Sequence, residues 1–163
     1  YLTALRKIYE IMSDKGICVL HTIGSILPPQ PNAPFIQRYI FPDGEIPHES
    51  DMAKNIEKSG LIMSDRETLI RHYDKTLEAW LNRFLKNKHI VKDLFDQKFV
   101  KMWEFYLASC SAAFKYRDLV VFQYQLVKNF DAIPSNRRDY IYSWRVSAIN
   151  KIVDEKKEKT QKN

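Results

Sequence analysis

The feature that most constrains the fold is an apolar run at residues 17–20, which follows a helical segment and a glycine. Residues 1–13 place five apolar side chains on one helical face: Leu2, Leu5, Ile8, Tyr9 and Met12. Gly16 ends the turn after this helix. The run shows no alternation of polar and apolar residues, which is typical of a strand covered on both faces. This order of elements predicts an α/β sheet whose other strands lie outside these 163 residues.

Size, charge and cysteine usage narrow the class of protein. With 163 residues, 45% of them hydrophobic, the chain can bury the core of one domain. Its net charge of +6 favours anionic partners such as nucleic acid or phospholipid head groups. Cys18 and Cys110 stand in apolar surroundings without a secretory signal, so we interpret them as buried thiols in a reducing, cytoplasmic compartment. The four glycines are scattered, which argues against a glycine-rich phosphate loop in this chain.

The middle of the chain begins with a proline-rich connection. Residues 26–50 hold six of the seven prolines, which predicts an irregular segment. Such a segment can be a lid or pocket wall, or a plain surface connection, and the residues favour neither. The other predicted elements are, in chain order, a short helix at 34–40, a helix at 49–59 closed by Gly60, a strand at 61–65, a helical region at 66–116, a strand at 119–127 and a charged helical tail at 138–163.

A histidine and a tyrosine are the first candidates for a site. His21 ends the apolar strand, and ligands of open α/β sheets bind at the carboxyl ends of strands. A ligand-binding role and a core role both fit this histidine. Gly24 is expected to let the chain turn away after it. Tyr73 begins the apolar stripe of a helix, where a core role is the more common one.

Other motifs are absent or ambiguous. The spacing of histidines, cysteines and acidic residues fits no metal site, and the sequence holds no Gly-x-Ser-x-Gly motif. The aromatic stripe at 99–114 fits either a core or the wall of an apolar channel. Residues 137–145 mix arginine with tyrosine and tryptophan, which fits a membrane interface, single-stranded nucleic acid or a solvated helix.

An ordered set of motifs carries a family resemblance. The set is His21-Thr-Ile-Gly-Ser25, Tyr39-Ile-Phe-Pro-x-Gly-x-x-Pro47, Tyr73-Asp-x-Thr-Leu-x-x-Trp80 and Lys98-Phe-x-Lys-Met-Trp-x-x-Tyr-Leu107, followed by Cys110, Phe114, Arg117 and Gln123. Over residues 1 to about 128 the chain resembles the C-terminal half of the cyclopropane-fatty-acyl-phospholipid synthases, the family that includes the mycolic acid methyltransferases.

The resemblance implies a fold. It is the C-terminal part of a class I S-adenosylmethionine-dependent methyltransferase, an α/β protein with a Rossmann-like seven-stranded sheet, helical lid insertions and its first strands absent from this chain. The implied assignments are strand 17–22 as the fifth strand, 61–65 and 119–127 as the last, antiparallel pair, 1–128 as part of the catalytic domain, 26–50 and 66–116 as lid or acyl-channel insertions, and 129–163 as a C-terminal tail.

The resemblance also implies an activity and a site. Members transfer a methylene from S-adenosylmethionine to the cis double bond of a phospholipid acyl chain, with bound bicarbonate as the base. Three bicarbonate-binding positions match here, namely His21, Ile23 and Tyr73, of which His21 and Tyr73 would be catalytic. The implied acyl-channel residues are Tyr39, Phe41, Trp103 and Tyr106. The remaining bicarbonate ligands and the S-adenosylmethionine loop would lie upstream of Tyr1, so we expect no cofactor-binding residue on this chain and no activity from it alone.

Partners and location follow from the same resemblance. We expect an unsaturated phospholipid in an anionic membrane surface, reached by peripheral contact from the cytoplasmic side of the inner membrane. We expect no nucleic acid and no metal as partners, and a homodimer is possible. The alternative is a non-catalytic lipid- or protein-binding remnant of a split or truncated synthase gene.

Overall fold

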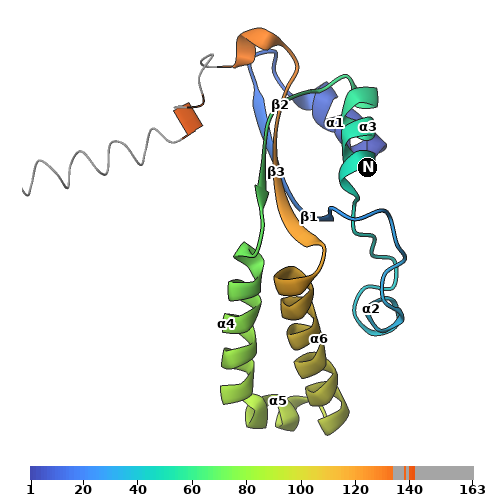
Figure 1. Ribbon diagram of the computed structural model, residues 1–163, viewed down its shortest axis with the longest axis vertical. Helices are drawn as coiled ribbons and strands as arrows, with labels where there is room; N and C mark the ends of the chain where they lie inside the picture. The colour runs from blue at the N-terminus through green and yellow to red at the C-terminus, as the bar shows by residue number, and fades with distance from the viewer. Residues whose placement is uncertain (134–137, 139, 142–163) are drawn as a thin grey trace, which may run out of the picture.

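The computed structural model describes residues 1–133, 138, 140 and 141. Its centre is a three-stranded antiparallel sheet in the order β1-β3-β2. The strands are β1 (Ile17–Ser25), β2 (Ile62–Leu69) and β3 (Leu119–Val127). Helices α1 (Leu2–Ile11) and α3 (Glu49–Ser59) lie side by side against one face of the sheet (Figure 1). A helical hairpin projects from one end of the sheet and consists of α4 (His72–Lys86), α5 (Lys88–Leu94) and α6 (Gln97–Tyr116).

Strand β3 separates two hydrophobic clusters, because its alternate residues point to opposite faces of the sheet. The first cluster packs the sheet against α1 and α3 and contains Leu5, Met52, Ile56, Leu61, Val120, Phe122, Tyr124 and Leu126. The second cluster packs the sheet against the hairpin and contains Leu77, Phe84, Val100, Leu107, Phe114 and Val121. The central place of β3 explains its apolar sequence and confirms the strand predicted at 119–127.

The sheet agrees with part of the expected arrangement. The last two strands, β2 and β3, form the expected antiparallel pair. The strand at 17–25 pairs with β3, so the expectation that the other strands of its sheet all lie outside these 163 residues was wrong. The described residues contain three strands and therefore only part of the expected seven-stranded sheet.

Strand β1 is longer than predicted, which corrects the expected places of His21 and Gly24. His21 is the fifth of nine residues of β1 and does not end the strand. The strand continues because its pairing with β3 runs on to Ser25, opposite Leu119, and the Ser25 N–H on the other edge donates to the Pro47 carbonyl at 3.0 Å. Gly24 remains extended under the ring of Phe122, whose Cδ2 would lie 2.6 Å from an added Cβ. Glycine is thus required here by close packing, and the expected turn at Gly24 was wrong.

The covering of β1 is also one-sided in the described residues. Cys18 and Leu20 pack against the first cluster. Ile17 and Val19, which point to the other face, are exposed. The expected burial on both faces is therefore wrong for the first half of the strand as the structure describes it.

The helical region begins later than the predicted residue 66. Residues 66–69 belong to β2, and Leu69 pairs with Val121 of β3. Pairing with a buried strand overrides the weak local preference of this charged segment. Arg71, with a φ of 61°, turns the chain into α4. Further breaks at Asn87 and at residues 95–96 divide the predicted region into α4, α5 and α6.

The remaining elements follow the predictions closely. Helix α2 (Pro34–Tyr39) interrupts the proline-rich segment, and α3 ends at Gly60 with a φ of 84°. A short 3-10 helix (Phe130–Ala132) follows β3. The cysteines are free and half-buried, and they pack in different clusters. The predicted tail helix at 138–163 lies almost entirely outside the described residues. No helix that the structure describes has the length and apolar character needed to span a bilayer.

Candidate functional site: the edge of β1 and the base of the helical hairpin

The side chains of His21 and Ile23 project from the face of β1 that carries the hairpin. Ile23 lies opposite Val121 and packs in the second cluster. His21 lies opposite Gln123 and is exposed. On this face of β1, the apolar Ile23 in the cluster is therefore followed by the polar, exposed His21 two residues away.

Gln123 fixes the hydrogen bonding of the His21 ring. The side-chain Nε2 of Gln123 lies 3.1 Å from Nδ1 of His21. With the amide NH₂ group on this side, Nδ1 accepts its hydrogen bond, and in that arrangement a neutral ring carries its proton on Nε2. The ring therefore presents an N–H donor on the side away from Gln123, which suits an anionic or carbonyl acceptor.

The backbone of β1 offers further donors along its outer edge. In an antiparallel ladder, the N–H groups of alternate residues point toward and away from the partner strand. The Ser25 N–H donates to the Pro47 carbonyl, away from β3. By the same alternation, the N–H groups of Ile23 and His21 point to the outer edge, where no other described strand pairs with β1. Ile23 thus presents a backbone donor two residues from the His21 ring.

Tyr73 lies in the first turn of α4, where the hairpin leaves the sheet. It is half-buried in the same cluster as Ile23. Its ring centroid lies 5.0 Å from that of Phe114 and 5.9 Å from that of Trp80. The structure therefore brings Ile23 and Tyr73 into one cluster and leaves His21 at the exposed margin of the same sheet face.

The predicted acyl-channel residues form one aromatic group with one outlier. Trp103 and Tyr106 of α6 have ring centroids 5.1 Å apart, and Phe41 of the proline-rich segment meets Tyr106 edge-on at 6.3 Å. Tyr39 is exposed and lies outside this group, with its ring 5.6 Å from that of Phe35. Phe35 in turn packs 4.8 Å from an aromatic ring of α6. The proline-rich segment therefore contacts α6 at two points.

The polar groups beside Tyr73 are held neutral. Burial, followed by the proximity of Cys110 and Tyr73, raises the pKa of the Tyr106 hydroxyl. Burial also raises the pKa of the Cys110 thiol. Both groups are protonated at neutral pH, so this wall places no negative charge against an anion. The described residues hold no group of three or more histidine, cysteine or acidic side chains that could bind a metal ion.

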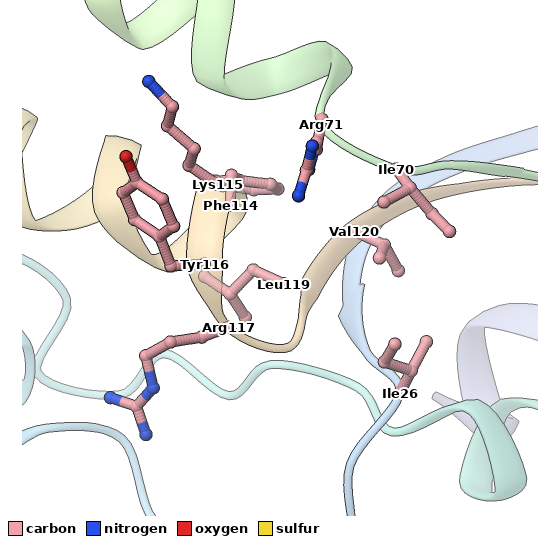
Figure 2. A pocket seen from close by; sticks show the side chains of 9 residues that line it. All are labelled: Ile26, Ile70, Arg71, Phe114, Lys115, Tyr116, Arg117, Leu119 and Val120. Carbon is pink, nitrogen blue, oxygen red and sulfur yellow. The ribbon is translucent and has the colours of Figure 1, made fainter.

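A hollow of about 280 Å³ lies at the base of the hairpin, where β2 leads into α4 and α6 leads into β3 (Figure 2). Its lining residues are Ile26, Ile70, Arg71, Phe114, Lys115, Tyr116, Arg117, Leu119 and Val120. Figure 2 shows Arg71 pointing toward the middle, whereas Lys115 and Arg117 point outward in different directions. None of the three predicted bicarbonate residues lines this hollow, and its cations do not converge on one point.

Sequence reasoning missed the pairing of His21 with Gln123. A signal was present, because Gln123 and Gln125 occupy alternate positions of an otherwise apolar strand. Polar residues two apart share one face of a strand, so they indicate that this face is only partly covered. The cross-strand register that places Gln123 opposite His21 required the structure.

Comparisons with known proteins identify a family. The family model of mycolic acid cyclopropane synthetase matches residues 1–124. The chain is similar to the cyclopropane-fatty-acyl-phospholipid synthase of Escherichia coli (strain K12), at 36% identity over 123 residues, or 76% of this chain and 32% of that protein. It is also similar to a probable fatty acid methyltransferase of Pseudomonas putida, at 41% identity over 81 residues, or 50% of this chain and 21% of that protein. The chain therefore spans no more than about a third of these relatives.

Solved structures show the same fold. The chain is similar to the cyclopropane synthase MmaA2 from Mycobacterium tuberculosis, with a TM-score of 0.71 and 22% identity over 77% of this chain and 48% of that one. It is similar to the mycolic acid cyclopropane synthase CmaA1 complexed with SAH and CTAB, with a TM-score of 0.71 and 24% identity over 77% of this chain and 49% of that one. These likenesses show an α/β fold that matches part of an S-adenosylmethionine-dependent methyltransferase. The family match over residues 1–124 shows that this chain belongs to the mycolic acid cyclopropane synthetase family.

Proposed function

We propose that this chain is the C-terminal part of a cyclopropane-fatty-acyl-phospholipid synthase. Such an enzyme transfers a methylene from S-adenosylmethionine to the cis double bond of a phospholipid acyl chain, with bicarbonate as the base. The observation that carries the proposal is the shared location of the three matched residues: His21 and Ile23 on one face of β1, and Tyr73 in the cluster that contains Ile23. The similarity to the Escherichia coli synthase supports the substrate class.

The donors on β1 suit a small anion. The Nε2–H of His21 and the backbone N–H of Ile23 both stand at the outer part of the strand, and hydrogen bonds to an anion are stronger than neutral ones. Gln123 would position the His21 ring by holding its Nδ1 as an acceptor. The Tyr106 and Cys110 side chains, which pack in the second cluster with Ile23 and Tyr73, are protonated and would not repel an anion. Bound bicarbonate would supply the base that takes up the proton lost when the ring closes.

Tyr73 would complete the site from the hairpin. Packing against Phe114 and Trp80 restricts its ring, and its place in the first turn of α4 puts it at the positive end of a helix dipole. Its hydroxyl would donate to the anion, while the aromatic group formed by Phe41 and Trp103 with Tyr106 would line the acyl channel. Aromatic faces stabilise a nearby cation, which suits the carbocation that the alkene becomes on methylation.

The residues of this chain could form only part of the proposed enzyme's active site. The described residues include no glycine-rich loop for S-adenosylmethionine, so we propose that the contacts to this cofactor lie outside the chain and that the chain alone is inactive. We place the enzyme at the cytoplasmic side of the inner membrane, in peripheral contact with its phospholipid.

The Tyr73→Phe substitution tests the site. It removes the hydroxyl and keeps the ring contacts, so turnover should fall far more than lipid binding does. Turnover is measured by mass spectrometry of phospholipids from cells that express the complete gene encoding this chain, and lipid binding by vesicle sedimentation. The control is Tyr9→Phe on α1, which lies against the other face of the sheet. Equal losses of turnover and binding in Tyr73→Phe would contradict the role proposed for its hydroxyl.

The same lipid analysis tests the function itself. Cells with the gene should contain acyl chains one methylene heavier than the monounsaturated chains of cells without it. Unchanged acyl chains, together with vesicle binding by the protein, would instead support a non-catalytic lipid-binding segment.

A further inference from the structure

We infer that the end of the helical hairpin farthest from the sheet binds the surface of a bilayer that contains anionic phospholipids. This hairpin tip comprises residues 83–101, which are the end of α4, all of α5 and the start of α6 (Figure 1). The inference rests on the proposed function for the choice of a phospholipid partner. It goes further by assigning the membrane contact to one element of the chain.

The hairpin tip exposes apolar side chains. Val91 of α5 packs into the second cluster, while Ile90 and Leu94, four residues apart on one helical face, point outward. Leu94 is 72% exposed and Phe95 is 62% exposed. The Phe95 ring is stacked 4.3 Å from Phe99, which restricts its position at the surface. A short helix that leaves these side chains in water offers them for burial elsewhere.

The hairpin tip is also strongly basic. It carries six cations and two acidic residues, which gives it a net charge of +4: Arg83, Lys86, Lys88, Lys92, Lys98 and Lys101 against Asp93 and Asp96. Among these cations, Lys88 is the one that forms an ion pair within the described residues, with Glu104. Asp96 accepts a hydrogen bond from the Phe99 N–H at 2.6 Å as the cap of α6. The positive charge of the hairpin tip is thus largely uncompensated by its neighbours.

The combination of exposed apolar side chains and positive charge at the hairpin tip favours a membrane surface over other anionic partners. Exposed leucine and phenylalanine insert at the boundary between head groups and acyl chains, while lysines interleaved with them attract anionic lipids. Lysine stems also lie along apolar surface while their ammonium groups reach the head groups. A single-stranded nucleic acid would require free aromatic faces for base stacking, and one face of Phe95 is already covered by Phe99.

Vesicle sedimentation of the 163-residue chain tests this inference. Binding is compared between vesicles of phosphatidylglycerol with phosphatidylethanolamine and vesicles of phosphatidylcholine alone, at low and at high salt. One variant removes charge (Lys92→Gln with Lys98→Gln), and another removes apolar surface (Leu94→Ser with Phe95→Ser). The matched controls lie away from the hairpin: Lys54→Gln with Lys58→Gln on α3, and Phe130→Ser, which is 75% exposed after β3.

The expected result is a salt-sensitive preference for the anionic vesicles. The charge variant should lower the partition coefficient about fivefold for each lysine removed. The apolar variant should lower it by ~10-fold or more. Both control variants should bind as the unaltered chain does, and circular dichroism should show that all variants are folded.

Three results would overturn the inference: folded hairpin-tip variants that bind like the unaltered chain, equal binding to both kinds of vesicle, or displacement of the chain from vesicles by single-stranded DNA. Failure here is distinguishable from failure of the proposed function, because sedimentation needs neither cofactor nor turnover. An enzyme that modifies detergent-dispersed phospholipid but whose hairpin-tip variants bind vesicles normally would refute this inference alone.

Discussion

Replacing Gly24 by alanine should destabilise the protein, because the extended strand leaves no room for a side chain there. An added Cβ would lie 2.6 Å from Cδ2 of Phe122 and 3.0 Å from the Pro47 carbonyl oxygen. Phe122 is fully buried, and the Pro47 carbonyl is held by the Ser25 N–H, so neither yields easily. Overpacking of this kind costs ~1–3 kcal/mol. The lower entropy of the unfolded alanine chain returns only ~0.4–1 kcal/mol. The free energy of unfolding should therefore fall by about 1–2 kcal/mol.

Urea unfolding, followed by circular dichroism, measures this loss. With a dependence of ~1–3 kcal/mol per molar urea, the midpoint should fall by roughly 0.3–2 M. Combining Gly24→Ala with Phe122→Leu removes the ring that meets the new methyl group, so the double variant should lose less than the sum of the two single losses. A midpoint for Gly24→Ala at or above that of the unaltered chain, as for a glycine in an open turn, would refute this packing argument. Strictly additive losses would refute the assigned contact.

Three further predictions concern stability and reactivity. The Tyr124 hydroxyl is buried without a hydrogen-bond partner among the described residues, and burial raises its pKa to about 12. Because the unfolded chain loses this proton near pH 10 and the folded chain does not, the free energy of unfolding should fall between about pH 10 and 12. Tyr124→Phe should reduce this fall and raise the urea midpoint at neutral pH. Urea titrations at each pH measure both effects. Asp96→Ala removes the cap of α6 and should lower the free energy of unfolding in urea by ~1 kcal/mol. It should also strengthen sedimentation with anionic vesicles. Unchanged stability would contradict the capping role. Burial raises the thiol pKa of Cys18 and Cys110. Alkylation by iodoacetamide at pH 8, followed by mass spectrometry, should therefore be slower for both thiols in the folded protein than in urea. Equal rates would contradict their burial.

The elements that sequence reasoning predicted well are those with strong local signals. Gly60 marks the end of α3 because its left-handed conformation suits glycine. The apolar residues of 119–127 mark a central strand, since only a strand covered on both faces needs them at nearly every position. The family motifs then gave the antiparallel pairing of β2 with this strand, whereas the place of β3 between β1 and β2 required the structure.

The errors occurred where tertiary contacts override local preference. The charged residues of β2 give no clear strand signal, and their pairing with β3 determines their conformation. Gly24 looked like a turn, whereas the ring of Phe122 explains the missing side chain. His21 was expected at the end of a strand that pairing with β3 in fact prolongs to Ser25.

The members of the candidate site come from the family motifs, whereas their geometry required the structure. The motifs named His21, Ile23 and Tyr73, and the structure adds that Ile23 and Tyr73 share a cluster. The Gln123 hydrogen bond, which leaves the proton of His21 on Nε2, depends on cross-strand register that no local pattern encodes. The assignment of bicarbonate to these residues stays a proposal.

The dependence of turnover on bicarbonate tests the proposed site most directly. The complete enzyme that contains this chain is assayed for methylene transfer to unsaturated phospholipid in buffer freed of carbon dioxide, and again with increasing bicarbonate. We predict turnover that rises with bicarbonate and saturates, a higher half-saturating concentration in His21→Gln, and a smaller increase in Gln123→Leu, which removes the hydrogen bond that positions the ring. Turnover that is independent of bicarbonate, or half-saturation unchanged in His21→Gln, would contradict the site proposed at the edge of β1.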